Sequence, residues 1–287
     1  MRLASICTDQ GDTAAVVLDE GVVSVERLAA ARQIRLPATL LELITGSHLP
    51  ALATAMAERP LPELILHDKV AYGPPLRRPG KIWGIGLNYR EHARSLDENV
   101  PTHPASFMKP ATAVIGLGDV IRLPAESQRV TAEAELAVII GRRCRQASRE
   151  EAGNAILGYT CVLDMTAEDI LRQNPRFLTR AKSFDTFFSF GPVILTADEV
   201  PDVPKLVVRT VVNGQVRREN TVSNMTFDPF ELVRFHSQGM TLEPGDIIST
   251  GTPGAWPLQA GDVVRCEISG FPPLENPVQA QAVEGRE

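Results

Sequence analysis

The chain has 287 residues, of which 44% are hydrophobic and 22% are charged, as in an ordinary globular protein with one large domain or with a small domain and a larger one. The net charge of -6 argues against a general nucleic-acid binder, because such proteins need a basic face. No apolar run approaches the roughly 20 residues of a membrane span, the N-terminus has no signal-peptide core, and the four scattered cysteines without a CxxC pair fit a reducing cytoplasm.

Residues 1–75 are expected to form a small N-terminal α/β domain. Segment 14–25 has the composition of two strands joined by a turn, and segment 36–57 is predicted to be helical with a break at Gly46. A proline-rich stretch follows, with Pro60, Pro62, Pro74, Pro75 and Pro79. Because proline disrupts both helices and sheets, this stretch indicates a boundary before a second domain of residues 78–287.

The second domain is expected to be mainly β. The pair Asn213-Gly214 between apolar flanks predicts a type I′ hairpin, and segment 246–250 is typical of a strand. Residues 229–239 are predicted to form a helix capped by Asp228. Because the strands do not alternate regularly with helices, a mostly antiparallel or mixed β core in an α+β fold fits better than a Rossmann sheet.

Two glutamates stand at the start of a predicted buried strand. Segment 132–141 opens with Glu133 and Glu135 and continues with apolar, mostly β-branched residues. Side chains two residues apart on a strand point to the same face, about 7 Å apart. Like charges at the edge of a core repel and lose hydration, so a hard divalent cation between them would stabilise the pair. Two solvated glutamates ahead of the core are the alternative, which this segment alone favours.

Asp164 adds a third carboxylate. It ends an apolar segment, 158–164, and precedes a T-x-x-D sequence at residues 166–169 that predicts the cap of a new helix. An acid at such a junction can face a cavity, although alone it is more simply a cap or turn residue. Together, Glu133, Glu135 and Asp164 would offer three oxygen ligands, which suit Mg²⁺ or Mn²⁺. No His or Cys pair accompanies them, which argues against zinc.

Segment 84–92 carries a Gly-x-Gly sequence followed by a histidine. The sequence is not a dinucleotide fingerprint, because Tyr89 occupies the place of the third glycine. His92 begins a predicted short helix among charged neighbours, and on its own it is most simply an exposed histidine.

From about residue 81 nearly to the C-terminus, the chain carries a series of short blocks in a fixed order. The blocks are Gly86-Leu87-Asn88-Tyr89-Arg90-Glu91-His92, Phe107-Met108-Lys109-Pro110, residues 133–141, Gly158-Tyr159-Thr160 with Asp164, Ala181-Lys182-Ser183-Phe184-Asp185, Gly191-Pro192, Val212-Asn213-Gly214, and residues 241–248 with Thr250-Gly251-Thr252-Pro253-Gly254. In this order they resemble the fumarylacetoacetate hydrolase family, and the ordered set is far more specific than any single block.

The resemblance implies a fold, an assembly and a metal site. The larger domain would be a mixed β-sandwich or β-roll with short helices, preceded by a small leading domain and paired into a homodimer. One Mg²⁺ or Mn²⁺ per chain would be held by Glu133, Glu135 and Asp164.

The resemblance also implies catalytic and substrate-binding residues. His92 would lie on a mobile segment that closes over the substrate and would take part in proton transfer or water activation. Lys182 would lie near the metal-bound substrate, and Thr252, Tyr89 and Arg90 would contact it. Taken singly, Lys182 is a surface cation and Thr252 a turn residue.

These residue types suit the chemistry of oxo acids. A 2-oxo or 2,4-dioxo acid offers adjacent oxygens that can chelate one cation, which stabilises the enolate formed on C–C cleavage or decarboxylation. His92 titrates near neutral pH and can act as base and then as acid. Lys182 would add positive charge beside the carboxylate or enolate.

The chain departs from the family pattern at two places. Many hydrolytic and decarboxylating members have a glutamate three residues after the lid histidine, where this chain has Ser95. Either Asp97 or Glu98 substitutes for it after a shift of the lid, or the reaction needs less water activation. Many members also have an arginine at the position of Glu168. The lid, residues 94–102, is expected to set specificity, because mobile loops commonly complete such sites.

The leading hypothesis is a metal-dependent hydrolase that cleaves a C–C bond in a 2,4-dioxo acid such as an acylpyruvate. Decarboxylation of an oxaloacetate-like diacid or keto–enol isomerisation is the alternative within the same fold. A catalytically silent binding protein is a third hypothesis. The expected partner is a small oxo acid, with neither nucleic acid nor membrane.

Overall fold

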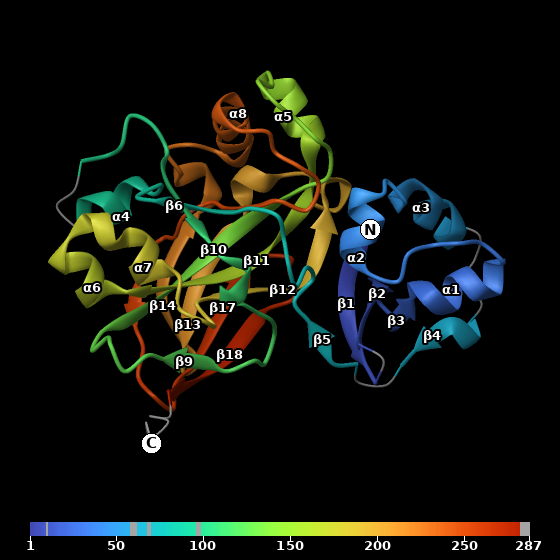
Figure 1. Ribbon diagram of the computed structural model, residues 1–287, viewed down its shortest axis with the longest axis horizontal. Helices are drawn as coiled ribbons and strands as arrows, with labels where there is room; N and C mark the ends of the chain where they lie inside the picture. Colours follow the sequence, from blue (N-terminus) through green and yellow to red (C-terminus); the bar gives the residue numbers. More distant parts are fainter. Residues whose placement is uncertain (10, 58–61, 68–69, 96–98, 282–287) are drawn as a thin grey trace.

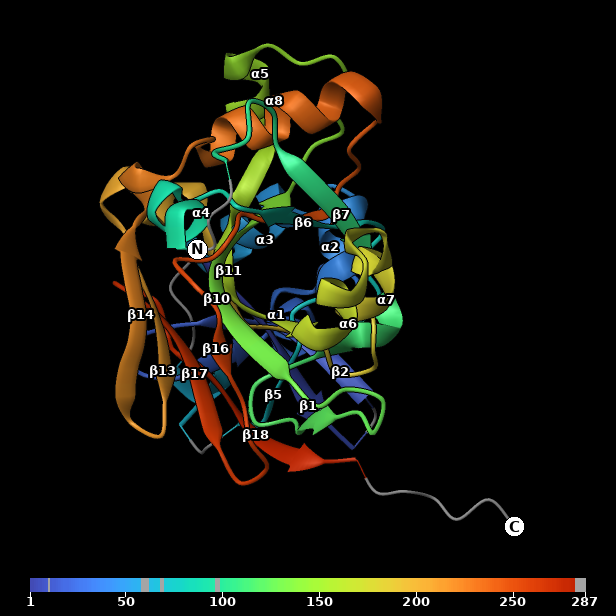
Figure 2. The same ribbon diagram turned by 90° about the vertical axis from the view of Figure 1, so that its left-hand side faces the viewer.

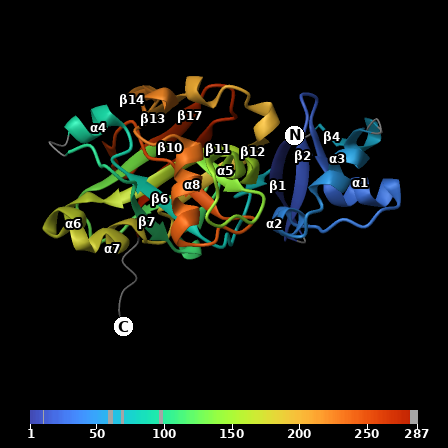
Figure 3. The same cartoon turned by 90° about the horizontal axis from the view of Figure 1, so that it is seen from above.

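The computed structural model describes residues 1–9, 11–57, 62–67, 70–95 and 99–281. A small N-terminal unit lies at one end of a larger body, and the view from above shows it as a separate lobe (Figures 1 and 3). The N-terminal unit contains β1 (Arg2–Thr8), β2 (Gly11–Val17), β3 (Val22–Ser24), α1 (Val25–Arg32), α2 (Leu40–Thr45), α3 (Leu49–Ala57), β4 (Ile65–Leu66) and β5 (Tyr72–Gly73).

Two sheets and five α-helices make up the described part of the larger body. The strands that join the larger sheet are β6 (Ile82–Gly86), β7 (Ala105–Lys109), β8 (Val114–Ile115), β10 (Val130–Ile140), β11 (Ile156–Ala167), β12 (Phe188–Thr196), β15 (Ile247–Ser249) and β16 (Trp256–Pro257). The smaller sheet contains β9 (Ile121–Leu123), β13 (Val207–Val212), β14 (Gln215–Thr221), β17 (Val263–Ile268) and β18 (Leu274–Ala280). The helices are α4 (Arg90–Ser95), α5 (Arg149–Ala155), α6 (Glu168–Gln173), α7 (Leu178–Lys182) and α8 (Pro229–Gly239).

The larger sheet runs through both parts of the molecule. Its main path is β4-β3-β2-β1-β12-β11-β10-β15-β6-β7, while the smaller sheet has the order β14-β13-β17-β18-β9. β1 pairs antiparallel with β12, with Leu3 opposite Ile194, so the N-terminal unit extends the sheet of the larger body. The proposed domain boundary between residues 75 and 78 falls after β5 and before β6.

Several local predictions are confirmed. The helical segment breaks near Gly46, because α2 ends at Thr45 and α3 begins at Leu49. Asn213 and Gly214 join β13 to β14 with φ values of 53° and 75°, the left-handed conformation that a type I′ turn requires. The fold as a whole is the predicted mainly β, α+β arrangement with a mixed sandwich. None of the helices in the described residues combines the length and apolar character needed to cross a membrane.

The helix caps give one confirmation and one correction. The Asp228 carboxylate accepts a hydrogen bond from the backbone N–H of Glu231 at 2.9 Å and caps α8 as predicted. The cap predicted at residues 166–169 is wrong, since α6 begins after Ala167 without any side-chain cap. Thr166 is still part of β11, and its hydroxyl donates to the Glu133 carboxylate instead.

The two faces of β10 have different surroundings. Ala134, Leu136 and Val138 belong to the core between the two sheets, and the Ala134 N–H donates to the Thr210 hydroxyl of β13 at 3.1 Å. On the opposite face, the C-terminal half of β10 is apolar and packs in a second core shared with the N-terminal unit. Figure 2 shows α6 and α7 on the side of β10 and β11 that faces away from the smaller sheet. The N-terminal half of β10 therefore presents its odd-numbered side chains toward these helices.

The close pairing of β11 with β12 depends on a glycine. A Cβ atom at Gly158 would lie 2.0 Å from the backbone oxygen of Leu195 on β12, so a side chain here would collide with the backbone of the neighbouring strand.

Gly158→Ala should therefore lower the free energy of unfolding by about 1–3 kcal/mol, measured by urea denaturation. The matched control is Gly153→Ala in α5, where the nearest atom, on Phe230, would be 3.4 Å away. Because alanine favours helix, that change should stabilise by about 0.5–1 kcal/mol, and equal effects of the two changes would contradict the interpretation.

Candidate active site

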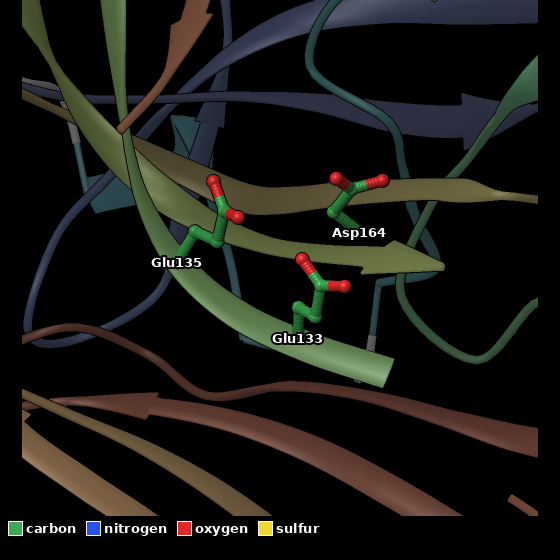
Figure 4. Close-up of side chains that lie close together, drawn as sticks. All are labelled: Glu133, Glu135 and Asp164. Carbon is green, nitrogen blue, oxygen red and sulfur yellow. The ribbon is translucent and has the colours of Figure 1, made fainter. Parts of the chain in front are cut away.

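Three carboxylates converge where β10 and β11 run side by side. Glu133 and Glu135 project from β10 and Asp164 from β11, all toward one another (Figure 4). Glu133 lies directly opposite Asp164 in the antiparallel ladder, and Glu135 follows two residues later on the same face. One oxygen from each carboxylate lies within 4.8 Å of the other two. The structure thus brings together the three residues that the sequence suggests as metal ligands.

Two of the carboxylates are fixed by neutral hydrogen-bond donors. Glu133 accepts from the Thr166 hydroxyl at 2.7 Å. Glu135, which is 1% exposed, accepts from the Ser249 hydroxyl at 2.5 Å and from the Gly251 backbone N–H at 2.8 Å. These donors hold the carboxylates in one orientation, which a metal site needs.

Lys182 at the end of α7 lies between two of the acids. Its Nζ donates to Glu133 at 2.9 Å and to Asp164 at 2.7 Å, and it lies 5.0 Å from the centre of the Phe107 ring. The residue is only 4% exposed, which excludes the surface-cation alternative.

A second buried lysine, Lys109, was missed as a site residue by the sequence reasoning. It ends β7, and its Nζ donates to Asp164 at 2.5 Å from a fully buried side chain. The available signal was its place in the block Phe107-Met108-Lys109-Pro110, where a lysine shares the inward face of a strand with Phe107. Thr166 and Ser249 were missed as well, since nothing in their local sequence indicates contact with an acid.

Burial and mutual repulsion shift the ionisation of this cluster. Burial, together with the charges of Asp164 and Glu133, raises the pKa of Glu135 to about 8. Burial alone would lower the pKa of Lys182, but the three carboxylates outweigh it and raise that pKa above its ordinary value. For Lys109, burial dominates over Asp164 and lowers the pKa.

A hard divalent cation fits this donor set. Three carboxylates against two ammonium groups leave one negative charge in excess when all are ionised. A cation among them would offset this charge and favour the ionised form of Glu135. The ligand group found in the described residues contains only carboxylates and no His or Cys, which matches Mg²⁺ or Mn²⁺ and not zinc.

His92 lies on α4 and lines a cavity next to the acids. The cavity has a volume of about 210 Å³, and Thr131 and Glu168 also line it. Burial is the main cause that lowers the pKa of His92; the charge of Lys182 acts in the same direction and that of Glu133 against it. A lowered pKa keeps the imidazole neutral at neutral pH, the form that can accept a proton.

The three predicted substrate-binding residues lie in different surroundings. Thr252 is buried, and its hydroxyl donates to the Gly254 carbonyl at 3.1 Å, in the loop whose Gly251 N–H contacts Glu135. Tyr89 is fully buried, and its hydroxyl has no hydrogen-bond partner among the described residues. Arg90 is exposed on α4. Substrate contact by these residues stays a prediction.

The two departures from the family pattern can be placed only in part. Asp97 and Glu98 lie outside the described residues, and only the backbone of Ser95 is described. Glu168 lies at the cavity, where it forms ion pairs with Arg129 and, at 2.7 Å, with Arg172. Its negative charge is therefore balanced locally.

Most of the larger body matches a known protein family, and curated relatives include an enzyme. Residues 81–279 match the family described as Fumarylacetoacetate (FAA) hydrolase C-terminal. Oxaloacetate tautomerase fahd2, a mitochondrial protein of Xenopus laevis, is 37% identical over 224 residues, which are 75% of this chain and 70% of that protein.

Two solved structures resemble nearly the whole chain. Maleylpyruvate hydrolase from Sphingobium sp. SYK-6, in complex with manganese(II) and pyruvate, is 32% identical with a TM-score of 0.80, over 98% of this chain and 100% of that one. The 5-carboxymethyl-2-hydroxymuconate delta-isomerase from Mycobacterium smegmatis is 34% identical with a TM-score of 0.77 and the same coverage. These relatives are a tautomerase, a hydrolase and an isomerase. With its family match over residues 81–279, the chain belongs to the fumarylacetoacetate hydrolase family.

Proposed function

We propose that the protein is a metal-dependent enzyme that hydrolyses a C–C bond in a 2,4-dioxo acid of the acylpyruvate type. The observation that supports this most directly is the convergence of Glu133, Glu135 and Asp164 within 4.8 Å, with Lys182 on two of them. A relative that acts on maleylpyruvate holds manganese and pyruvate in its crystal structure, which supports the same reading.

The metal would be one Mg²⁺ or Mn²⁺ per chain, held by Glu133, Glu135 and Asp164. When bound, such a cation supplies Lewis acidity to the oxygens of an oxo acid. Ser249 and Gly251 would keep Glu135 oriented toward it through the hydrogen bonds described above.

The other residues have separate roles in this proposal. In hydrolysis, water adds to the acyl carbonyl, the adjacent C–C bond breaks, and its electron pair goes to the carbon that becomes the methyl group of pyruvate. His92 accepts a proton from the water and returns a proton to that carbon. Lys182 places a positive charge where the oxygen charge grows, and Thr252 lies in the loop whose Gly251 N–H contacts Glu135.

Keto–enol isomerisation is the second candidate, with decarboxylation of an oxo diacid close to it. Isomerisation needs only a proton removed and returned, so it requires no carboxylate to activate water. Ser95 at the position of the lid glutamate favours it, and so does the similarity to an oxaloacetate tautomerase. The homodimer and the cytoplasmic location also stay predictions.

Loss of one ligand charge should abolish metal binding. Glu135→Gln keeps an oxygen that can accept from Ser249 and Gly251, so it removes the charge while preserving these contacts. Loss of a group that only hydrogen-bonds to a metal ligand already weakens metal sites by about 10–100-fold, so we expect the loss of a ligand charge to lower Mn²⁺ affinity by more than about 100-fold in calorimetry and to abolish turnover. Glu267→Gln on β17 removes an equal charge in the other sheet and should bind Mn²⁺ like the wild type. Unchanged affinity of Glu135→Gln would refute the metal site.

Loss of the histidine should slow the reaction without affecting the metal. His92→Gln should lower kcat by about 10²–10⁴-fold, the usual contribution of a positioned acid or base, while Mn²⁺ affinity stays within about twofold. The control is His67→Gln, a change at an exposed histidine of the N-terminal unit. An unchanged kcat in His92→Gln would remove His92 from the mechanism.

A substrate panel distinguishes the candidate reactions. With Mn²⁺ present, acetylpyruvate should yield acetate and pyruvate in equal amounts, quantified by NMR. Oxaloacetate tests the second candidate, since its keto and enol forms are resolved by ultraviolet absorbance and its decarboxylation releases carbon dioxide. Turnover of oxaloacetate alone would replace the hydrolase proposal by the second candidate, and turnover of neither would favour a silent binding protein.

A further inference from the structure

Asn88 lies where the chain leaves β6 and turns toward α4. The residue is 1% exposed, and Leu87 before it has a φ of 55°, so the backbone changes direction sharply at this point. His92 stands four residues later, on α4. The segment that bears the histidine therefore extends directly from Asn88.

Both the amide nitrogen and the amide oxygen of the Asn88 side chain are hydrogen-bonded. Nδ2 donates to the Thr250 carbonyl at 2.7 Å and to the Phe227 carbonyl at 2.9 Å, while Oδ1 accepts from the Phe227 N–H at 2.9 Å. The backbone carbonyl of Asn88 also accepts from the Thr226 N–H at 2.6 Å. These partners fix the orientation of the amide, because a flipped amide would place its oxygen against two carbonyl oxygens. Asn88 thus joins three segments that are distant in the sequence.

One of these segments holds Glu135, a proposed metal ligand. Ser249 and Gly251 flank Thr250, and both donate to the same oxygen of Glu135, Oε2, at 2.5 and 2.8 Å. Gly251 also packs directly on Asn88: its φ is 97°, and an added Cβ atom would lie 2.8 Å from Asn88 Cβ. The hydrogen bond to Thr250 and this packing therefore keep the two donors in place on Glu135.

The other segment, residues 220–227, supports the start of α4. Tyr89 pairs with Met225 in an isolated antiparallel bridge, and Asn220 donates from Nδ2 to Glu91 at 3.0 Å. The chain between β6 and His92 is thus held from two sides, by residues 220–227 and by the loop that contacts Glu135. The Asn88 amide is hydrogen-bonded to both of them.

We propose that Asn88 is a positioning residue, which couples the placement of His92 to the orientation of Glu135. The proposal rests on the proposed function for the roles of the histidine and of the metal. Without the amide, buried backbone groups of Thr250 and Phe227 lose their partners, and the two loops can shift relative to α4. Proton transfer and metal binding both need their groups held in a fixed geometry. Loss of this one side chain should therefore weaken both.

Asn276 on β18 offers a matched control. It is also fully buried, its Nδ2 donates to two backbone carbonyls at 2.7 and 2.8 Å, and its Oδ1 accepts from the Ser189 hydroxyl at 2.8 Å. Ser189 follows Phe188, the residue opposite Asp164, so its side chain points to the other face of the sheet. Removal of Asn276 therefore deletes an equivalent set of hydrogen bonds on the side away from the acids.

Asn88→Ala and Asn276→Ala should lower the Tm by similar amounts, because each removes the hydrogen bonds of one buried amide. Asn88→Ala should also lower kcat and reduce Mn²⁺ affinity in calorimetry by about 10-fold or more. In the metal-free protein, hydrogen exchange in peptides that contain Gly251, followed by mass spectrometry, should become at least about 10-fold faster. Asn276→Ala should match the wild type in Mn²⁺ affinity, kcat and this exchange rate.

Two further variants separate positioning from stability. Asn88→Asp keeps the size and the acceptor for the Phe227 N–H but replaces the N–H donors by oxygen, so it should give the same pattern and serves as the test if Asn88→Ala does not fold. In a His92→Gln background, either change at Asn88 should lower kcat by a much smaller factor than in the wild type, because an absent histidine cannot be displaced. A residue that only stabilises the fold would give additive effects.

Wild-type Mn²⁺ affinity and wild-type exchange at Gly251 in the Asn88 variants would overturn the proposal. Equal changes in Asn276→Ala would also overturn it, because a general loss of stability would then explain them, and full additivity with His92→Gln would remove the coupling to the histidine. If the wild type binds no Mn²⁺ or turns over none of the acids, the proposed function fails, while exchange at Gly251 still decides whether Asn88 holds this loop.

Discussion

Three carboxylates packed at one edge of a protein core repel each other, and much of the surrounding structure serves to keep them together. Lys182 and Lys109 supply the opposite charge from two separate segments, and Thr166, Ser249 and the Gly251 N–H supply neutral donors. Without these contacts, carboxylates this close would take up protons or move apart. Burial, together with the charges of Asp164 and Glu133, still raises the pKa of Glu135 to about 8.

The features of the site that depend on local sequence could be predicted. Those that depend on how distant strands pair could not. The i, i+2 spacing of Glu133 and Glu135 on an apolar strand sufficed to place them on one face. Their contact with Asp164 arises from the register of β10 and β11, which depends on packing between distant segments, so the sequence could suggest the three acids as a ligand set but not the pairing that brings them together. Lys109 lies on a third segment. Its contact with the acids also depends on packing between distant segments, so Lys109 was not predicted as a site residue.

The fold shows the same division between features that local sequence decides and features that tertiary contacts decide. The Asn213-Gly214 turn and the Asp228 cap are decided by a few adjacent residues, and both were predicted correctly. Thr166 has the spacing of a cap, but its hydroxyl donates to Glu133, because β11 continues past Asp164. A tertiary contact here overrides a local preference, which sequence spacing alone cannot reveal.

The relatives include a hydrolase, an isomerase and a tautomerase, so one architecture supports several reactions. An oxo acid that chelates a cation is activated in the same way for each of them. What separates the reactions must then lie where water and the distal end of the substrate are handled. In this chain, Glu168 and three arginines, Arg129, Arg172 and Arg218, line the cavity beside His92.

The pairing of β1 with β12 gives the N-terminal unit a role beyond that of an appended lobe. β12 lies next to β11, which carries Asp164, and β1 covers the backbone of Val193 to Leu195 with ladder hydrogen bonds. If the first 75 residues were absent, this apolar stretch would become an open sheet edge, the kind of surface through which proteins aggregate. The N-terminal unit thus covers a sheet edge of the larger body.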